Sequence, residues 1–96
     1  MQPSPAMNPN MQQRIKVMII DDSAIIRGLV SRWISAEPDF DLVGTGVNGN
    51  DGVKKVVSLN PDVIILDIEM PEMDGITALP LILKALPGVK VIMAST

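Results

Sequence analysis

Short apolar runs rich in β-branched residues alternate along this chain with segments of helical periodicity. Four such runs, at residues 15–20, 41–47, 62–67 and 89–95, are bounded by Asp, Gly or Pro and are too short for helices. Strands of a parallel sheet read as apolar runs of this kind, because helices cover both faces of the sheet. The order βαβαβαβ therefore predicts an α/β domain with a mainly parallel sheet and right-handed crossovers.

Three helical patterns fill the intervals between the predicted strands. Apolar residues recur with helical spacing over 25–34, 53–59 and 76–86. Ser23 is placed to cap the first of these helices, because its side chain precedes the first apolar turn. Pro80 fits badly, since a proline beyond the first turn of a helix removes a hydrogen bond and favours a kink.

Composition excludes several classes of function. The chain of 96 residues is long enough for one small domain, and its net charge of −3 argues against a nucleic-acid-binding face. The absence of Cys and His removes disulfides, thiolate and imidazole metal ligands, and nucleophiles activated by histidine. Its apolar runs are far shorter than the roughly 18 residues that a membrane span needs. The reactive chemistry must therefore depend on carboxylates, hydroxyls and lysines.

The first segment differs in composition from the rest. Residues 1–13 are polar, rich in proline and without charge, so we expect a flexible tail before a domain spanning 14–96. This segment lacks the apolar core of a secretory signal. Together with the lack of Cys, that favours a cytoplasmic protein.

Acidic residues follow two of the predicted strands. Asp21 and Asp22 end the first strand and Asp67 ends the third, so all three carboxylates meet at one sheet edge if those strands are neighbours. Crowded carboxylates recruit a cation or raise a pKa, and Mg²⁺ suits oxygen ligands of this kind. Asp67 is the candidate nucleophile toward phosphorus, and Ser95 would add a hydroxyl at the same edge. Singly, each residue could instead cap a helix or face water.

A second motif supports a competing hypothesis. Residues 44–49 match G-x-G-x-x-G between a strand and a helix, with Asp67 and Glu69 about 20 residues later, as in dinucleotide-binding folds. Asp51, however, lies where a pyrophosphate would need a bare helix N-terminus. This interpretation also leaves the Asp21–Asp22 pair unexplained. It ranks well behind the carboxylate site.

The carboxylates belong to longer motifs. The stretches IIDDSA at 19–24, LDIEMPEMDG at 66–75 and VIMAS at 91–95 resemble the receiver domain of two-component response regulators. The second stretch most resembles the receivers of chemotaxis protein-glutamate methylesterases. The resemblance covers residues 14–96 and implies a flavodoxin-like doubly wound fold.

The resemblance also assigns roles to individual residues. It implies that Asp67 is the phosphoacceptor, that Asp22 binds Mg²⁺ directly and that Asp21 acts through water. The backbone carbonyl of Glu69 would be a further Mg²⁺ ligand, and Ser95 the switch hydroxyl that follows the phosphoryl group. The implied partner is a histidine kinase, in chemotaxis, and the module would regulate an output domain, which in a full-length protein would be a methylesterase. The alternative is an inert acidic interaction domain.

The chain departs from the family pattern at its end. The family continues through a helix, a strand ending in a phosphoryl-contacting lysine, and a last helix, whereas this sequence stops at Thr96. Lys90 does not replace that lysine, because it begins its strand roughly 16 Å from the reactive edge. The last strand would be an apolar sheet edge, and such edges pair with other chains. We therefore expect either a fragment or a self-associating chain.

Overall fold

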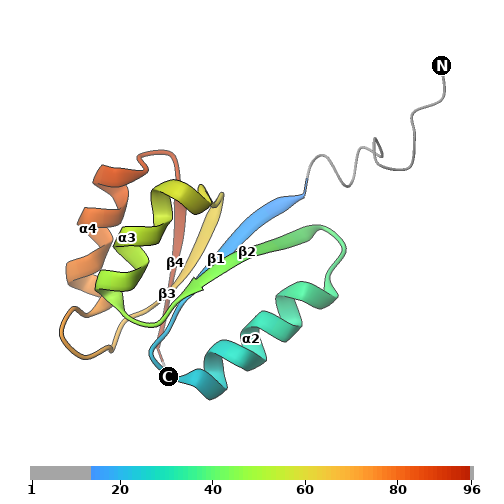
Figure 1. The fold of residues 1–96 in the computed structure, drawn as a ribbon, viewed down its shortest axis with the longest axis horizontal. Coiled ribbons are helices and arrows are strands. Elements are labelled where there is room, and N and C mark those ends of the chain that lie inside the picture. The colour runs from blue at the N-terminus through green and yellow to red at the C-terminus, as the bar shows by residue number, and fades with distance from the viewer. Residues whose placement is uncertain (1–13, 96) are drawn as a thin grey trace.

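The structure, a computed structural model, describes residues 14–95, so the predicted tail at 1–13 lies outside the described residues. Strands and helices alternate along the chain, as the apolar pattern predicted (Figure 1). In chain order the elements are β1 (Ile15–Ile20), α2 (Ala24–Ala36), β2 (Phe40–Gly46), α3 (Gly49–Leu59), β3 (Val63–Asp67), α4 (Gly75–Ala85) and β4 (Lys90–Ala94).

All strand pairs are parallel, and the strand order is β2-β1-β3-β4. The predicted α/β class and doubly wound topology are confirmed, and β1 has the predicted bounds. The largest difference is at α3, which begins at Gly49 rather than near Val53. Its first turn is rich in glycine and polar residues, so hydrophobic periodicity could not mark it.

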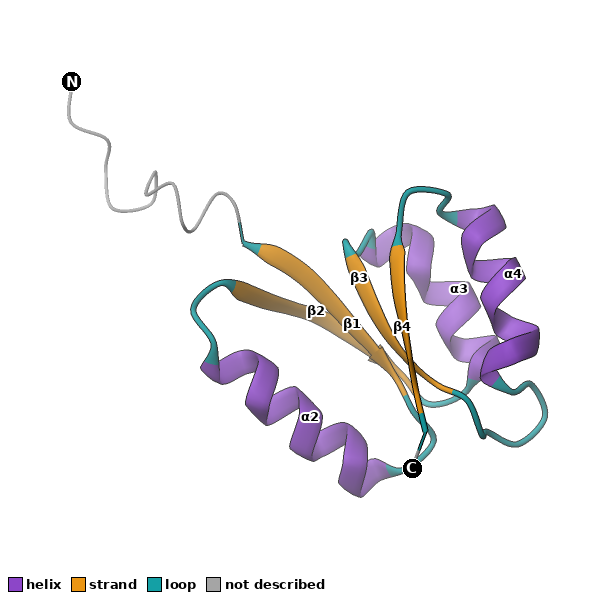
Figure 2. Cartoon of the chain, turned by 180° about the vertical axis from the view of Figure 1, so that it is seen from behind, coloured by secondary structure: helices purple, strands orange, loops and turns teal. Residues whose placement is uncertain are grey.

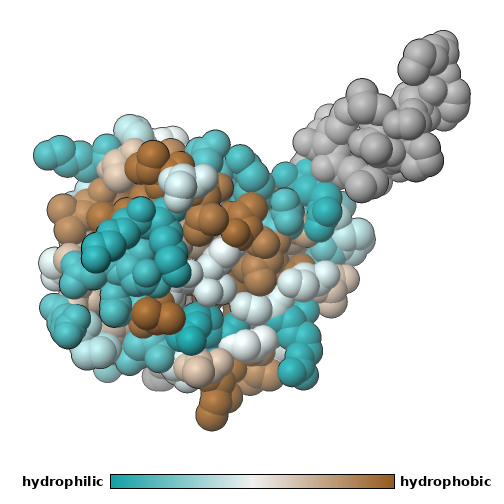
Figure 3. Space-filling view, viewed as in Figure 1, coloured by the Kyte–Doolittle hydropathy of each residue, from teal (hydrophilic) through white to brown (hydrophobic). Residues whose placement is uncertain are grey.

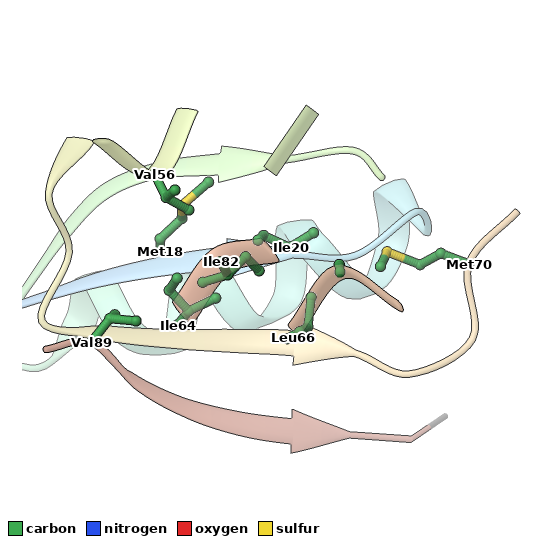
Figure 4. Close-up of a cluster of buried hydrophobic side chains, with 9 residues drawn as sticks. Met18, Ile20, Val56, Ile64, Leu66, Met70, Ile82 and Val89 are labelled. Atoms are coloured by element: carbon green, nitrogen blue, oxygen red, sulfur yellow. The ribbon is translucent and has the colours of Figure 1, made fainter. Parts of the chain in front are cut away.

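Helices lie on both sides of the sheet. Helices α3 and α4 cover one face and α2 lies alone on the other (Figures 1 and 2). The core fills the layer under α3 and α4, where side chains from β1, β3 and both helices meet (Figure 4). Its fully buried members include Met18, Ile20, Ile64, Leu66, Val56 and Ile82.

Side-chain caps fix where the helices start. The Ser23 hydroxyl accepts a hydrogen bond from the Ile26 N–H at 3.2 Å, as predicted. Asn48 caps α3 and Asp74 caps α4 in the same way, each at 2.8 Å. Each of the three caps follows the carboxyl end of a strand, so every helix starts at the same sheet edge. Pro80 lies in the second turn of α4, inside the helix.

The glycines of the G-x-G-x-x-G motif allow close packing. A Cβ atom at Gly46 would lie 3.0 Å from the Cα of Gly52, and one at Gly49 would lie 2.6 Å from the Met73 carbonyl oxygen. A Cβ at Gly52 would collide with the Ile20 side chain. The first turn of α3 therefore packs against β1 and the loop after β3 at backbone distance. This packing accounts for the glycines without a dinucleotide.

The other face of the sheet is only half covered. Helix α2 packs on β1 and β2, while no helix among residues 14–95 lies over β3 and β4 on that side (Figure 2). Apolar side chains of β4 and α2 are exposed, with Ile92 56%, Trp33 63% and Ile25 76% exposed. Apolar surface is also visible among polar groups on the face drawn in Figure 3. Within residues 14–95, no helix has the length and apolar character to cross a membrane.

Candidate functional site

Three carboxylates converge at the carboxyl edge of the sheet. Asp21 and Asp22 directly follow β1 and Asp67 ends β3, and these strands are paired neighbours. One carboxylate oxygen from each residue lies within 4.8 Å of the others. Asp21 and Asp67 are 5% and 2% exposed, whereas Asp22 is exposed. The spatial convergence that the strand order predicted is therefore present.

Asp21 is held by hydrogen bonds on three sides. Its N–H donates to the Gly46 carbonyl at 3.1 Å, and its carboxylate accepts from the Ser23 N–H at 2.8 Å. Its carbonyl accepts from Arg27 Nη1 at 2.7 Å. Sequence reasoning missed Arg27. The available signal was a basic residue in the first turns of a helix, where the helix dipole disfavours positive charge.

The environment of Asp67 opposes its ionisation. Burial is the largest cause that raises the pKa of Asp67, and the nearby charges of Asp21 and Asp22 raise it further. The Glu69 N–H donates to Asp67 Oδ1 at 3.2 Å and acts in the opposite direction. The net direction is upward from the ordinary value for aspartate. A cation bound in the cluster would therefore stabilise the ionised form of the Asp67 carboxylate.

The loop after β3 connects Asp67 to the start of α4. The Gly75 N–H donates to the Ile68 carbonyl at 2.8 Å, and the Met73 N–H donates to the Pro71 carbonyl at 2.7 Å, which closes a three-residue turn. Glu72, at the centre of that turn, has a φ of 69°, in the left-handed region. A pocket opens beside the loop, lined by Ile68, Glu69, Met70, Pro71 and Asp74.

Gly75 fixes the position of the phosphoacceptor candidate. A Cβ atom there would collide with the backbone carbonyl oxygen of Asp67, which is not free to move as a side chain is. The start of α4 is thus in direct contact with the end of β3. Glycine is required here for close approach, since no described glycine has a positive φ.

The cluster fits a hard divalent cation. Within residues 14–95, the salt bridge found is Lys55–Asp51, so none of the three clustered carboxylates has a cationic partner within 4.0 Å. Three uncompensated oxygen donors at mutual distances of 4.8 Å or less match the ligand type that Mg²⁺ takes. Asp21, Asp22 and Asp67 would hold the ion.

Glu69, Ser95 and Lys90 are the other residues that sequence analysis considered for the site. The Glu69 side chain is exposed, and its carbonyl is the part that the resemblance implicates. Ser95, also exposed, follows Ala94, which pairs with Asp67 across β3 and β4. Lys90 pairs with Val63 at the opposite end of the strands, so it is remote from the cluster, as predicted.

The sheet has the order β2-β1-β3-β4, an acidic cluster at its carboxyl edge and a hydroxyl after the outer strand. This combination is typical of receiver domains in signalling proteins. The family model of the response regulator receiver domain matches residues 17–96, and the chain belongs to that family, a component of two-component signalling.

Similar curated relatives belong to one group within the receiver family, the protein-glutamate methylesterases. The chain is 54% identical over 81 residues to a protein-glutamate methylesterase/protein-glutamine glutaminase of Maricaulis maris, covering 84% of this chain and 20% of that protein. A protein of the same description from Nitrobacter hamburgensis is 52% identical over 91 residues, covering 95% of this chain and 24% of the relative. The chain therefore spans about a fifth to a quarter of the length of these curated relatives.

Solved structures agree with this assignment. The response regulator domain of Thermotoga maritima CheB superposes with a TM-score of 0.80 at 44% identity, covering 85% of this chain and 60% of that one. The CheX–CheY–BeF3–Mg complex from Borrelia burgdorferi gives 0.77 at 34% identity, covering 84% of this chain and 61% of that chain. The predicted resemblance to receiver domains of the methylesterase type is confirmed.

Proposed function

We propose that this domain accepts a phosphoryl group from a histidine kinase onto Asp67 in a reaction that depends on Mg²⁺. The observation that carries the proposal is the buried Asp67 carboxylate grouped with Asp21 and Asp22 within 4.8 Å, with no cationic partner among the described residues. Membership of the receiver family supports the same reaction.

In the transfer, an Asp67 oxygen forms a bond to phosphorus while the bond from phosphorus to the donor imidazole nitrogen breaks. The bonding pair stays on that nitrogen, which is left as neutral imidazole once protons equilibrate. The cation supplies neutralisation of the charge on the phosphoryl oxygens. Asp21, Asp22 and Asp67 would hold that cation, Asp22 directly and Asp21 through water, and the Glu69 carbonyl would be a further ligand.

Ser95 is the proposed switch hydroxyl. It follows the β4 residue that pairs with Asp67, so a small displacement of the chain after β4 would bring its hydroxyl to a phosphoryl oxygen. The Ser95 O–H then donates to that oxygen. A rearrangement on this side of the sheet would carry the signal to an output domain.

The relatives indicate which kinase and which output domain would take part in the reaction. The CheB domain of Thermotoga and the methylesterase relatives favour a chemotaxis kinase as phosphodonor. The cytoplasmic location is proposed from the sequence, as above. In a full-length protein the output would be the methylesterase activity named in the relatives. The receiver itself would catalyse only its own phosphorylation.

A phosphorylation assay with mass detection tests the proposal. Incubation with acetyl phosphate and Mg²⁺ should add about 80 Da, the mass of one phosphoryl group, and Asp67→Asn should abolish the addition. Asp62→Asn is the matched control, because Asp62 lies at the opposite end of β3. Absence of both the added mass and Mg²⁺-dependent beryllofluoride binding in the unaltered chain would overturn the proposal and favour an inert acidic interaction domain.

Self-association through β4 is a second proposal on the same fold. Strand β4 is the last strand in the order β2-β1-β3-β4, so one side of its backbone has no partner strand among the described residues. Ile92 on this strand is 56% exposed. An apolar edge of this kind pairs readily with another copy.

A further inference from the structure

The Arg27 side chain reaches back from α2 to the acidic edge of the sheet. Its Nη1 donates to the Asp21 carbonyl at 2.7 Å, across six positions in sequence. We propose that Arg27 is a positioning residue for the Mg²⁺ site: it fixes the peptide group between Asp21 and Asp22 and so aims the Asp22 carboxylate at the cluster. This inference rests on the function proposed above.

The location of Arg27 is unfavourable on charge alone. It lies near the N-terminus of α2, whose partial positive charge repels cations, and the first turn of that helix contains no acidic residue. Arg27 is only partly exposed, so solvent does not fully screen it. A guanidinium in this position needs a specific acceptor, and the carbonyl of Asp21 is the acceptor found.

The peptide that Arg27 holds is the link between the two acidic residues. The carbonyl of Asp21 and the N–H and Cα of Asp22 lie in one rigid plane, so the orientation of that plane positions the Cα from which the Asp22 side chain projects. The other groups of Asp21 are already bound, its N–H to Gly46 and its carboxylate to the Ser23 N–H. The Arg27 bond therefore fixes the carbonyl, which is the remaining backbone polar group of this residue.

A positioning role and a purely electrostatic role for Arg27 predict opposite changes in Mg²⁺ affinity when the side chain is removed, so a binding measurement separates them. If Arg27 acted only as a positive charge beside three carboxylates, its removal would strengthen Mg²⁺ binding, because like charges repel. If it positions the carboxylates, its removal weakens binding. Groups that orient metal ligands typically contribute about 10–100-fold in metal affinity.

The experiment measures Mg²⁺ binding by isothermal titration to the unaltered chain, Arg27→Met, Arg27→Lys and Arg32→Met. Arg32 is exposed on the same helix, so Arg32→Met removes the same charge at a remote position. We expect about 10-fold weaker binding for Arg27→Met, recovery toward the parent value for Arg27→Lys, and no change for Arg32→Met. Equal or tighter binding by Arg27→Met would overturn the inference.

A second readout needs no metal. The Ser23 amide hydrogen, which donates to Asp21 Oδ1 at 2.8 Å, should exchange several-fold faster in Arg27→Met than in the unaltered chain in EDTA, while amides of β3 keep their protection. Unchanged exchange at Ser23 would also contradict the inference. Failure of the unaltered chain to bind Mg²⁺ would refute the proposed function instead, and the exchange result would still decide the role of Arg27.

Discussion

At the level of single residues, the acidic edge combines burial with uncompensated charge. Asp67 is 2% exposed and has two carboxylate neighbours, so its ionised form is destabilised in the folded chain. The site therefore lowers the stability of the domain when no cation is bound. That conflict between folding and function can be measured.

Replacement of Asp67 by Asn should stabilise the folded domain at neutral pH in EDTA. The amide removes the buried charge and its repulsion with Asp21 and Asp22, and we expect a gain of about 1–3 kcal/mol in the free energy of unfolding. Mg²⁺ should stabilise the unaltered chain much more than the variant, because only the former keeps all three carboxylates. Urea unfolding with and without Mg²⁺ measures both effects. A less stable variant in EDTA would contradict the repulsion.

Gly75 and Gly28 provide a matched pair of Gly→Ala substitutions. At Gly75 the new methyl group meets the Asp67 carbonyl, so we expect a loss of about 1–3 kcal/mol and weaker Mg²⁺ binding. At Gly28, inside α2, nothing lies within 4 Å, and alanine should add up to about 1 kcal/mol. Thermal unfolding gives both values. Equal effects at the two positions would show that the contact at Gly75 is unimportant.

Some of the site could be foreseen from individual residues and some could not. The carboxylates of Asp22 and Asp67 were predictable, because strand ends of a parallel sheet share an edge and the strands could be recognised by their apolar runs. The bond from Arg27 was not, since the reach of a long side chain depends on the exact start of α2. The left-handed backbone of Glu72 also carried no signal, because glutamate is unusual in that region.

At the level of elements, α3 shows how local polar groups replace hydrophobic periodicity. Asn48 caps the helix, and Asp51 accepts from the Val47 N–H at 2.9 Å and pairs with Lys55 at 3.0 Å. The position that would bind an anionic ligand is thus filled by the helix's own aspartate. Asp51 lies at this terminus as predicted, but the helix starts earlier than the apolar pattern indicates, because Gly49 and Gly52 interrupt that pattern.

Asp51→Asn should weaken α3 in a manner that depends on pH. The Val47 N–H is the largest cause that lowers the pKa of Asp51, and Lys55 contributes next. Because the folded pKa lies below the unfolded one, the stabilisation is present above the unfolded pKa and is lost as pH falls through the folded pKa. We expect a loss of roughly 1 kcal/mol at neutral pH, shrinking toward zero in strong acid.

Urea titrations in steps from neutral to acidic pH measure this dependence. Lys55→Met is the control, and it should cost less than Asp51→Asn because the bond to the Val47 N–H remains. A deficit for Asp51→Asn that stays constant down to the lowest pH would contradict the assignment.

At the level of the whole molecule, the two faces of the sheet are unequal. The face under α3 and α4 contains the buried cluster, whereas on the side of α2 no described helix covers β3 and β4. The topology was predictable from the alternation of strands and helices, and so was the position of β4 at the edge of the sheet.

Ile92→Lys should shift the chain toward the monomer. The substitution places a charge on the exposed side of β4, where paired edges from two copies would otherwise meet. Sedimentation over a range of protein concentrations measures the effect, with Lys54→Met on exposed α3 surface as the control. If the unaltered chain is monomeric throughout that range and unfolds cooperatively, the proposed self-association is wrong.

The contact of Gly75 with the Asp67 carbonyl has a consequence for how a disturbance at the acidic edge can spread. Together with the close approach of Gly49 to Met73, it makes one flank of Asp67 a stack of touching backbone with no slack. On the opposite flank, where the chain leaves β4, the described backbone is joined by the hydrogen bond from the Ile68 N–H to the Ala94 carbonyl at 3.0 Å, and no contact as close as those of the glycines is found among residues 14–95. A displacement introduced at Asp67 should therefore be transmitted toward Ser95, because the backbone on the Gly75 side is too closely packed to yield. The difference in stiffness between the two flanks thus sets the direction in which the structural change spreads.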